Sequence, residues 1–292
     1  MEGATQAPSK LNHPCFHGSA GARWGRVHLP VAPGCNIQCN FCNRLYDCAN
    51  ENRPAVTCGI LEPGNVLTYL DLLLRRRSDI SVVGIAGPGD PFCEPELTLE
   101  TIRAVHLVYP GLLLCISTNG LNLAKYIDEL AESGVTHITV TVNAVDPLIG
   151  RRIYSRVTIN NQTYQGIEAA EILFSRQIEA IAELKARGLI VKINTVVIPG
   201  INMDHIGAIA EEVSRLGADM MNCIPMIPVP DTSFEHLGAP ADAEIDRIRN
   251  SASFYIPQMY HCRRCRADAV GLLCSDEENL CSSINNSNRS VL

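Results

Sequence analysis

Residues 35–42 read Cys35-Asn-Ile-Gln-Cys39-Asn-Phe-Cys42 and place three thiols within eight residues of one loop. The loop follows the first β-branched run, at 27–31. A structural zinc site would need a fourth protein ligand, and a thioredoxin-like dithiol needs only two cysteines. Three thiolates on a 4Fe–4S cluster leave one iron open to an exogenous ligand. The spacing therefore predicts an open iron–sulfur cluster at the end of a strand.

The chain around this loop alternates short β-branched runs with longer helical patterns, which is typical of βαβ units with parallel strands. Six strands are expected, at 27–31, 80–86, 112–117, 137–142, 189–197 and 219–225. Helices are expected between them, at 63–76, 96–108, 123–132, 165–187 and 204–216. Six such units fit either a doubly wound sheet or an incomplete (β/α)6 barrel, and periodicity does not choose between the two.

Polar and glycine residues concentrate where the expected strands end. In both architectures ligands gather at the carboxyl ends of the strands. These ends carry Pro33-Gly34-Cys35, Gly87-Pro88-Gly89-Asp90, Ser117-Thr118-Asn119-Gly120, Asn143 and Ile224-Pro225. The sequence thus predicts a ligand-binding rim on one side of the sheet.

Composition narrows the class of protein. A length of 292 residues allows one large domain or two small ones. Lys and Arg number 24 against 31 Asp and Glu, and the resulting charge of −7 argues against binding to nucleic acid or an anionic membrane. The first ten residues lack the apolar segment of a signal peptide, and no apolar run is long enough to span a bilayer. We therefore expect a cytoplasmic protein whose 13 cysteines are metal ligands or reactive thiols.

The alternation of strand and helix patterns stops after about residue 240. The tail contains Cys262, Cys265, Cys274 and Cys281 but no further clear strand, and we expect its polar end, 282–290, to be disordered. Three regions follow: an N-terminal extension with a cluster ligand (1–26), a partial barrel (27–240) and a C-terminal extension with a Cys-x2-Cys pair (241–292).

The Cys-x3-Cys-x2-Cys spacing, with an aromatic residue before the last cysteine, resembles the signature of the radical S-adenosylmethionine (SAM) superfamily. The resemblance implies an incomplete (β/α)6 barrel of the TIM type. It implies that Cys35, Cys39 and Cys42 are the catalytic cluster ligands and that SAM binds the open iron. The implied cofactor-binding residues are Gly87, Gly89, Asp90, Ser117, Thr118, Asn119, Asn143, Lys192, Asn194 and Ile224.

Further stretches resemble the NifB family, the radical SAM proteins of nitrogenase cofactor assembly. They are His13-Pro-Cys15, His28-Leu-Pro-Val-Ala-Pro33, Cys39-Asn-Phe-Cys42-Asn-Arg44, Tyr46-Asp-Cys48, Ser117-Thr-Asn-Gly120 and Cys262-Arg-Arg-Cys265-Arg-Ala-Asp268. The resemblance implies a short, stand-alone form that works in an anaerobic cytoplasm. It would fuse two 4Fe–4S clusters around a SAM-derived carbide, with an extra sulfur, into an eight-iron precursor. Implied partners are cluster donors, a reductant protein such as ferredoxin, and carrier or scaffold proteins that accept the product.

Three clusters with three protein ligands each require nine ligands under this resemblance. Besides the three loop cysteines, it points to Cys15, Cys48, Cys115, Cys262 and Cys265. A histidine suits the ninth place because protonation can release it from iron. We favour His28 over His13, His17 and His261. We assign Cys48, Cys115 and His28 to one auxiliary cluster, and Cys15, Cys262 and Cys265 to the other. Cys58, Cys93 and Cys223 are expected to be buried and inert.

Less specific interpretations remain open at several positions. Gly87-Pro88-Gly89 could be an ordinary turn and Asp90 a helix N-cap. His28 could be a hydrogen-bonded core residue, and Cys115 a small buried hydrophobe. Lys192, Asn194 and Ile224 could simply form a solvated rim. At the level of function, the alternatives are another radical SAM enzyme with auxiliary clusters, such as a peptide-modifying or molybdopterin-pathway enzyme, and a non-catalytic iron–sulfur scaffold or carrier.

Overall fold

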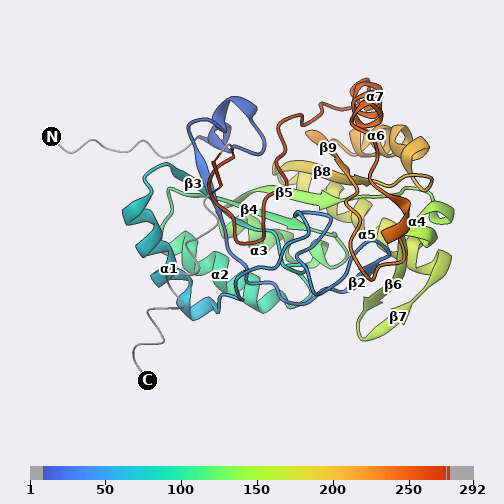
Figure 1. Ribbon diagram of the computed structural model, residues 1–292. Coiled ribbons are helices and arrows are strands. Elements are labelled where there is room, and N and C mark those ends of the chain that lie inside the picture. Colours follow the sequence, from blue (N-terminus) through green and yellow to red (C-terminus); the bar gives the residue numbers. More distant parts are fainter. Residues whose placement is uncertain (1–8, 274, 277–292) are drawn as a thin grey trace.

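Six parallel strands form the main sheet, in the order in which they occur along the chain (Figure 1). The computed structural model describes residues 9–273 and 275–276. Within this part the parallel strands are β1 (Gly25–His28), β3 (Ile80–Ile85), β4 (Leu113–Thr118), β5 (Val135–Thr141), β8 (Ile190–Val197) and β9 (Met220–Pro225). In the described chain the strand order ends at β9, whose other edge makes only an isolated bridge from Met221 to Gln258, so the curled sheet does not close. This confirms the incomplete (β/α)6 barrel.

Helices cover the outer side of this sheet. They are α1 (Pro63–Arg76), α2 (Pro95–Val108), α3 (Ile127–Glu132), α5 (Gly166–Ala186) and α6 (Ile206–Arg215). In α6, Ile206, Ile209, Ala210 and Val213 are buried, the spacing of an apolar helical face. Because helices cover one face and loops the other, β3 is buried along its whole length and reads as a continuous apolar run. The expected helices are confirmed, with small shifts at their ends.

A second, three-stranded sheet was not expected from the sequence. It consists of β2 (Ile37–Cys39), β6 (Tyr154–Ile159) and β7 (Gln162–Tyr164), preceded by the helix α4 (Pro147–Ile153). Asn160 and Asn161 turn the β6–β7 hairpin with φ of 50° and 62°. The cysteine loop therefore supplies a strand to a hairpin inserted between β5 and α5. A three-residue strand has too short a pattern to be recognised in the sequence.

The expectation of a tail without a further clear strand was wrong. Helix α7 (Asp242–Ala252) follows β9, and β10 (Val270–Leu272) pairs antiparallel with β1. Strand β11 (Ser275–Asp276) extends the sheet beyond β10. An edge strand such as β1 exposes unpaired backbone groups, and the returning tail covers them. The expectations for Cys274, Cys281 and 282–290 fall outside the described residues.

The two extensions lie together beside β1. Cys15 packs against a small cluster of Cys265, Ala269 and Leu273.

Short 3-10 helices occur at Lys10–Asn12, Gly18–Ala20, Leu123–Tyr126, Met203–His205 and Glu235–Leu237. Among the helices of the described part, we find none that is long and apolar enough to cross a membrane.

Candidate active site

The cysteine loop is fixed on the rim by backbone pairing with the inserted hairpin. Ile37 pairs with Val157 and Cys39 with Tyr154. The Gln38 side chain donates to the carbonyl oxygens of Cys39 (3.1 Å) and Cys42 (2.7 Å), which closes the turn between these two cysteines. Cys39 is buried, and Cys35 and Cys42 are half-buried.

Burial and nearby acidic groups raise the pKa values of two of the loop thiols, Cys35 and Cys39, and such surroundings favour binding of a positively charged metal centre. Burial raises the pKa of the Cys35 thiol to about 12 and that of Cys39 well above its usual range, and the Asp90 carboxylate adds to the effect at Cys35. A bound metal centre would reverse this effect, because it stabilises the thiolates directly. Among residues 9–273 and 275–276, no three His, Cys, Asp or Glu side chains are arranged around one metal ion. Three thiols spread along one loop suit a four-iron cube rather than a single ion.

Cys48 lies beside this loop. The side-chain amide nitrogen of Asn50 is 3.5 Å from the Cys39 sulfur and 3.8 Å from the Cys48 sulfur. Burial raises the pKa of Cys48, and the charges of Cys42 and Cys35 add to the rise. Cys48 is thus close to the three loop cysteines, whereas the other expected auxiliary ligands line a separate cavity.

The loop after β3 packs directly against the loop that leads to the cysteines. Gly89 N donates to Ala32 O (2.6 Å), and Asp90 N donates to Gly34 O (2.7 Å). A Cβ on Gly89 would lie 1.8 Å from Gly34 O. Glycine is therefore required here for the close approach of two protein loops, and the expected contact of Gly89 with SAM stays a prediction.

Replacing Gly89 with alanine should destabilise the protein by about 1–3 kcal/mol, because the new methyl group must displace the Gly34 backbone. Urea unfolding of the cluster-free protein measures the change. Gly111→Ala is the matched control, since an added Cβ there has no atom within 4 Å. Equal stability of the two variants would contradict the packing role of Gly89.

The buried Asp90 carboxylate joins the loop after β3 to the loop after β4 through hydrogen bonds. One Asp90 carboxylate oxygen accepts from Thr118 Oγ1 (2.9 Å) and Asn119 N (2.7 Å), and the other accepts from Phe92 N (2.9 Å). Asn119 also donates to Asn36 Oδ1 (2.7 Å). Glu94, not Asp90, is the N-cap residue of α2. The hydrogen bonds of Asp90, Thr118 and Asn119 therefore join the rim loops to one another.

Asn143 is fully buried rather than placed on an open rim. Its Oδ1 accepts from Val196 N (2.8 Å), and its Nδ2 donates to Asn50 Oδ1 (3.0 Å). Ile224 is also buried, at 1% exposure. The interpretation of Lys192 and Asn194 as a solvated rim is wrong, because they are only 7% and 3% exposed.

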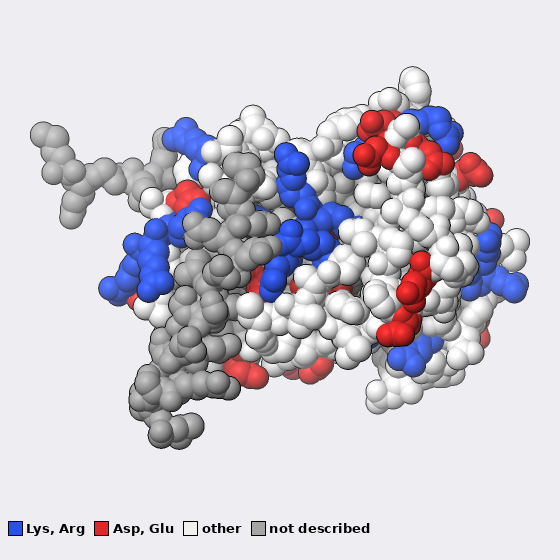
Figure 2. All heavy atoms as spheres, in the orientation of Figure 1, with Lys and Arg blue, Asp and Glu red and all other residues white. Residues whose placement is uncertain are grey.

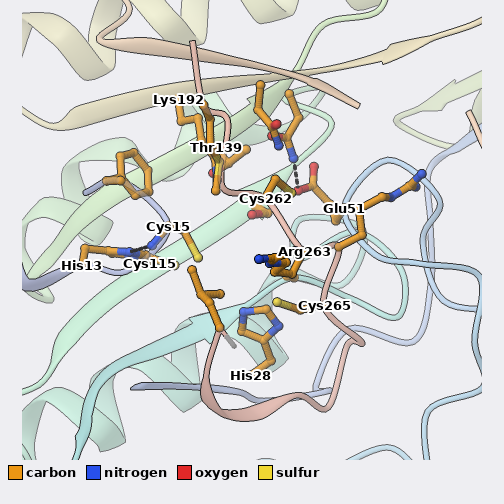
Figure 3. A pocket seen from close by; sticks show the side chains of 18 residues that line it. His13, Cys15, His28, Glu51, Cys115, Thr139, Lys192, Cys262, Arg263 and Cys265 are labelled. Atoms are coloured by element: carbon orange, nitrogen blue, oxygen red, sulfur yellow. Dashed lines mark hydrogen bonds between the residues drawn. The ribbon is translucent and has the colours of Figure 1, made fainter. Parts of the chain in front are cut away.

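A cavity lies inside the rim, between the sheet and the two extensions (Figure 3). Of the expected SAM-binding residues, Ser117, Lys192 and Asn194 line it. Five of the expected cluster ligands also line it: Cys15, His28, Cys115, Cys262 and Cys265. The fold brings these ligands together from the N-terminal extension, β1, β4 and the tail, and it leaves Cys48 as the one expected auxiliary ligand outside the lining.

His28 and Cys115 meet on one side of the cavity. A Cβ on Gly84 would lie 3.1 Å from His28 Cδ2 and 3.3 Å from Cys115 Sγ, so both side chains lie over this glycine. Burial raises the pKa of Cys115 to about 12, and the nearby Cys15 adds to the rise. This proximity agrees with placing His28 and Cys115 at one cluster.

The hydrogen bonds of the histidines separate His28 from one of its rivals, His13. His28 Nδ1 lies 3.0 Å from Arg266 O, and since a carbonyl only accepts, Nδ1 carries the proton and Nε2 the lone pair. Metal-binding histidines usually have this second hydrogen bond. In His13, Nδ1 accepts from Cys15 N (3.1 Å), which leaves the proton on Nε2. His261 also directs one ring nitrogen, Nε2, to a carbonyl, Pro14 O (3.0 Å), which leaves its lone pair on Nδ1, so this bond does not separate it from His28. In the neutral ring of His28, Nε2 is the atom through which a metal would bind.

Glu51 is a buried acid of the cavity that the sequence analysis missed. Its carboxylate accepts from Thr141 Oγ1 (2.5 Å) and Asn194 Nδ2 (2.7 Å). Burial raises its pKa to about 7, although these hydrogen bonds and the charge of Lys192 oppose the rise. No local pattern around Glu51 marks it as internal, because its position depends on contacts with β5 and β8.

This raised pKa predicts a pH-dependent stability. From pH 4.5 to about 7 the unfolded state releases the Glu51 proton and the folded state keeps it. The cluster-free protein should therefore lose roughly 3 kcal/mol of stability over this range, and Glu51→Gln should remove that loss. Urea unfolding at about pH 5 and pH 8 measures both values. Glu100→Gln, at an exposed position of α2, is the control, and an unchanged pH dependence in Glu51→Gln would contradict the prediction.

Buried arginines hold the tail over the cavity. Arg26, on β1, donates to Gly271 O (2.6 Å) and to the Cys265 sulfur (2.9 Å). Arg264 donates to Pro225 O (2.6 Å), Ala49 O (2.5 Å) and Asn52 O (2.9 Å). Figure 2 shows Lys and Arg side chains gathered over the middle of this face, where the tail crosses it in Figure 1. The tail is therefore anchored between Cys262 and Cys265, through Arg264, and at Cys265 itself, through Arg26.

The remaining cysteines differ from the expectation that all three are buried. Cys223 is buried, but Cys93 is half-buried and Cys58 is exposed. Cys58 lies in an irregular connection before α1, with its sulfur 3.7 Å from Arg266 Nη2. A residue type that is usually buried can lie outside when its segment has no apolar face to pack.

Comparison with known proteins first identifies the class. The family model described as "Radical SAM superfamily" matches residues 29–213, more than half of the chain. Methylornithine synthase (PylB) superposes with a TM-score of 0.53 at 16% identity, covering 96% of this chain and 85% of that chain. The enzyme anSMEcpe with bound AdoMet gives a TM-score of 0.54 at 13% identity, covering 81% and 61%. The chain belongs to the radical SAM superfamily.

Within the superfamily, the chain is similar to proteins named "FeMo cofactor biosynthesis protein NifB". It is 49% identical over 262 residues to the one from Chlorobaculum tepidum, covering 90% of this chain and 62% of the relative. It is 40% identical over 269 residues to the one from Azotobacter vinelandii, covering 91% and 53%. The chain thus spans less than two thirds of the length of either relative.

Proposed function

We propose that this protein is a radical SAM enzyme of nitrogenase cofactor biosynthesis. Its substrates are two 4Fe–4S clusters, which it fuses with a carbide from SAM and an extra sulfur into an eight-iron core. The observation that carries the proposal is the cavity inside the rim, where four cysteines and His28 converge from distant parts of the chain. The similarity to the NifB proteins supports the same conclusion.

Cys35, Cys39 and Cys42 would hold the resident cluster, which supplies the electron for SAM cleavage. Cys48, Cys115 and His28 would hold one substrate cluster, and Cys15, Cys262 and Cys265 the other. A histidine ligand suits a substrate that must leave, because protonation of Nε2 releases the metal. Arg26 and Arg264 would keep the tail cysteines in place while the clusters react.

The carbon must be attached to a substrate cluster before it can lose its hydrogens. One SAM would donate its methyl group to a cluster sulfide by polar displacement and leave as S-adenosylhomocysteine. A second SAM, cleaved by one electron, would yield methionine and a 5′-deoxyadenosyl radical. This radical would take one hydrogen atom from the methyl group and become 5′-deoxyadenosine. Both uses require SAM to lie close to the cavity that holds the substrates.

SAM with a trideuterated methyl group tests this chemistry in the reconstituted protein. We expect deuterium in 5′-deoxyadenosine and accumulation of S-adenosylhomocysteine, both measured by mass spectrometry. Deuterium-free 5′-deoxyadenosine without S-adenosylhomocysteine would leave a radical SAM enzyme of another kind. Absence of both products under a strong reductant would leave a scaffold or carrier.

The proposed reaction also requires partners. Cluster donors would load the cavity, a reductant protein such as ferredoxin would deliver electrons, and a carrier or scaffold protein would accept the product. Co-purification with the loaded protein under anaerobic conditions is the direct test for the acceptor.

A further inference from the structure

Asn50 donates to two sulfurs that belong to different proposed clusters. Its Nδ2 lies 3.5 Å from Cys39 Sγ and 3.8 Å from Cys48 Sγ. The side chain is 4% exposed, so water does not compete strongly for these contacts. A primary amide has two N–H groups, which is enough for one hydrogen bond to each sulfur.

The orientation of this amide is dictated by the backbone. Val196 N donates to Asn143 Oδ1 (2.8 Å), and a backbone N–H can only donate. Asn143 must therefore present its Nδ2 to Asn50, where Oδ1 accepts at 3.0 Å. With its oxygen used in this way, Asn50 can direct only N–H groups toward Cys39 and Cys48. The chain of donors thus runs from β8 through two buried amides to two thiols.

We propose that Asn50 is a positioning residue that donates hydrogen bonds to a ligand of the SAM-binding cluster and to a ligand of an auxiliary cluster at the same time. Hydrogen bonds to ligand sulfurs stabilise the more negative, reduced state of an iron–sulfur cluster and raise its reduction potential. Asn50 therefore links the potentials of the two sites. The Cys39 part of the proposal rests on membership of the superfamily, and the Cys48 part rests on the proposed function.

These hydrogen bonds also give Asn143 a role that differs from the cofactor contact implied by the family resemblance. Asn143 is fully buried and touches neither sulfur in any recorded hydrogen bond of the described residues, but it sets which atoms Asn50 presents. Asn143→Asp keeps an acceptor for Val196 N and loses the donor to Asn50. The Asn50 amide would then turn its N–H groups toward the new carboxylate and its oxygen toward the sulfurs.

The test is redox titration with electron paramagnetic resonance on the reconstituted full chain. The SAM-binding cluster is identified by the signal that changes when SAM is added, and the auxiliary cluster by the signal lost in Cys48→Ala. We expect Asn50→Leu to lower both midpoint potentials and to change both spectra. Asn143→Asp should do the same without altering a residue that contacts sulfur. Asn50→Asp, which has the same size, repeats the test if the leucine variant does not fold.

Asn202→Asp is the matched control. Asn202 is a buried asparagine whose amide donates to the Asn143 carbonyl oxygen (2.9 Å) and whose Oδ1 accepts from Ile198 N (2.7 Å), with no cysteine contact recorded for it. The Asn202→Asp variant should leave both midpoint potentials unchanged. Unchanged potentials in the Asn50 variants, or an equal shift in Asn202→Asp, would overturn the proposal, and a shift of one signal alone would overturn the link. If wild-type protein makes no eight-iron product, the proposed function fails, but the Cys39 result can still be read.

Discussion

Replacing Cys42 with alanine should abolish reductive cleavage of SAM. Cys42 is one of three thiols in a loop that the β2–β6 pairing holds in place, and two thiolates do not retain an open four-iron cluster. Iron content should fall by about one third, since one of three proposed clusters is lost. Anaerobic iron and sulfide analysis, with 5′-deoxyadenosine measured after reduction, gives both values.

Cys93→Ala is the matched control for this variant. Cys93 lies beside the same loop, with its sulfur 3.0 Å from the position of a Cβ on Gly34, but it is not part of the three-cysteine motif. It should retain both iron and cleavage. Cleavage at the wild-type rate in Cys42→Ala would refute the assignment of the loop cysteines.

Removing both Cys262 and Cys265 should abolish formation of the eight-iron product and preserve SAM cleavage. These cysteines line the cavity from the tail, whereas the three loop cysteines are outside its lining, in and beside the strand that pairs with β6. The double alanine variant should therefore still form 5′-deoxyadenosine, uncoupled from fusion. Product is measured by iron analysis and spectroscopy of the extracted cluster.

A second variant distinguishes the loss of a cluster ligand from a folding defect. Cys265 Sγ accepts from the buried Arg26 guanidinium (2.9 Å), and alanine would remove that acceptor. Cys262→Ala combined with Cys265→Ser keeps a hydrogen-bonding atom for Arg26. Cys223→Ala, which removes a fully buried cysteine outside the cavity lining, controls for loss of a core thiol. Normal product from the Cys262 and Cys265 variants would exclude these residues as cluster ligands.

Local sequence pattern was sufficient for the six parallel strands and their helices, and the family resemblance was needed to choose the barrel. β-branched runs bounded by glycine and polar loops indicated all six parallel strands, and apolar periodicity indicated the helices between them. These signals are reliable because each depends on residues only a few positions apart. The pattern failed for β2 and β10, since strands of three residues form only when a distant edge offers backbone partners.

The Cys-x3-Cys-x2-Cys motif was enough to indicate the chemistry of the cysteine loop, because three thiols within eight residues are close in any fold. Which other groups lie together depends on contacts between distant parts of the chain. Cys15, Cys115 and Cys262 are far apart in the chain and meet because the carboxyl ends of parallel strands and both extensions converge on one cavity. Asn50 and Glu51 have no distinguishing local pattern, and nothing in the local sequence marks Asn143, at the end of a strand, as buried. Their roles arise because a buried polar group generally needs a partner, and the partners come from elsewhere in the fold.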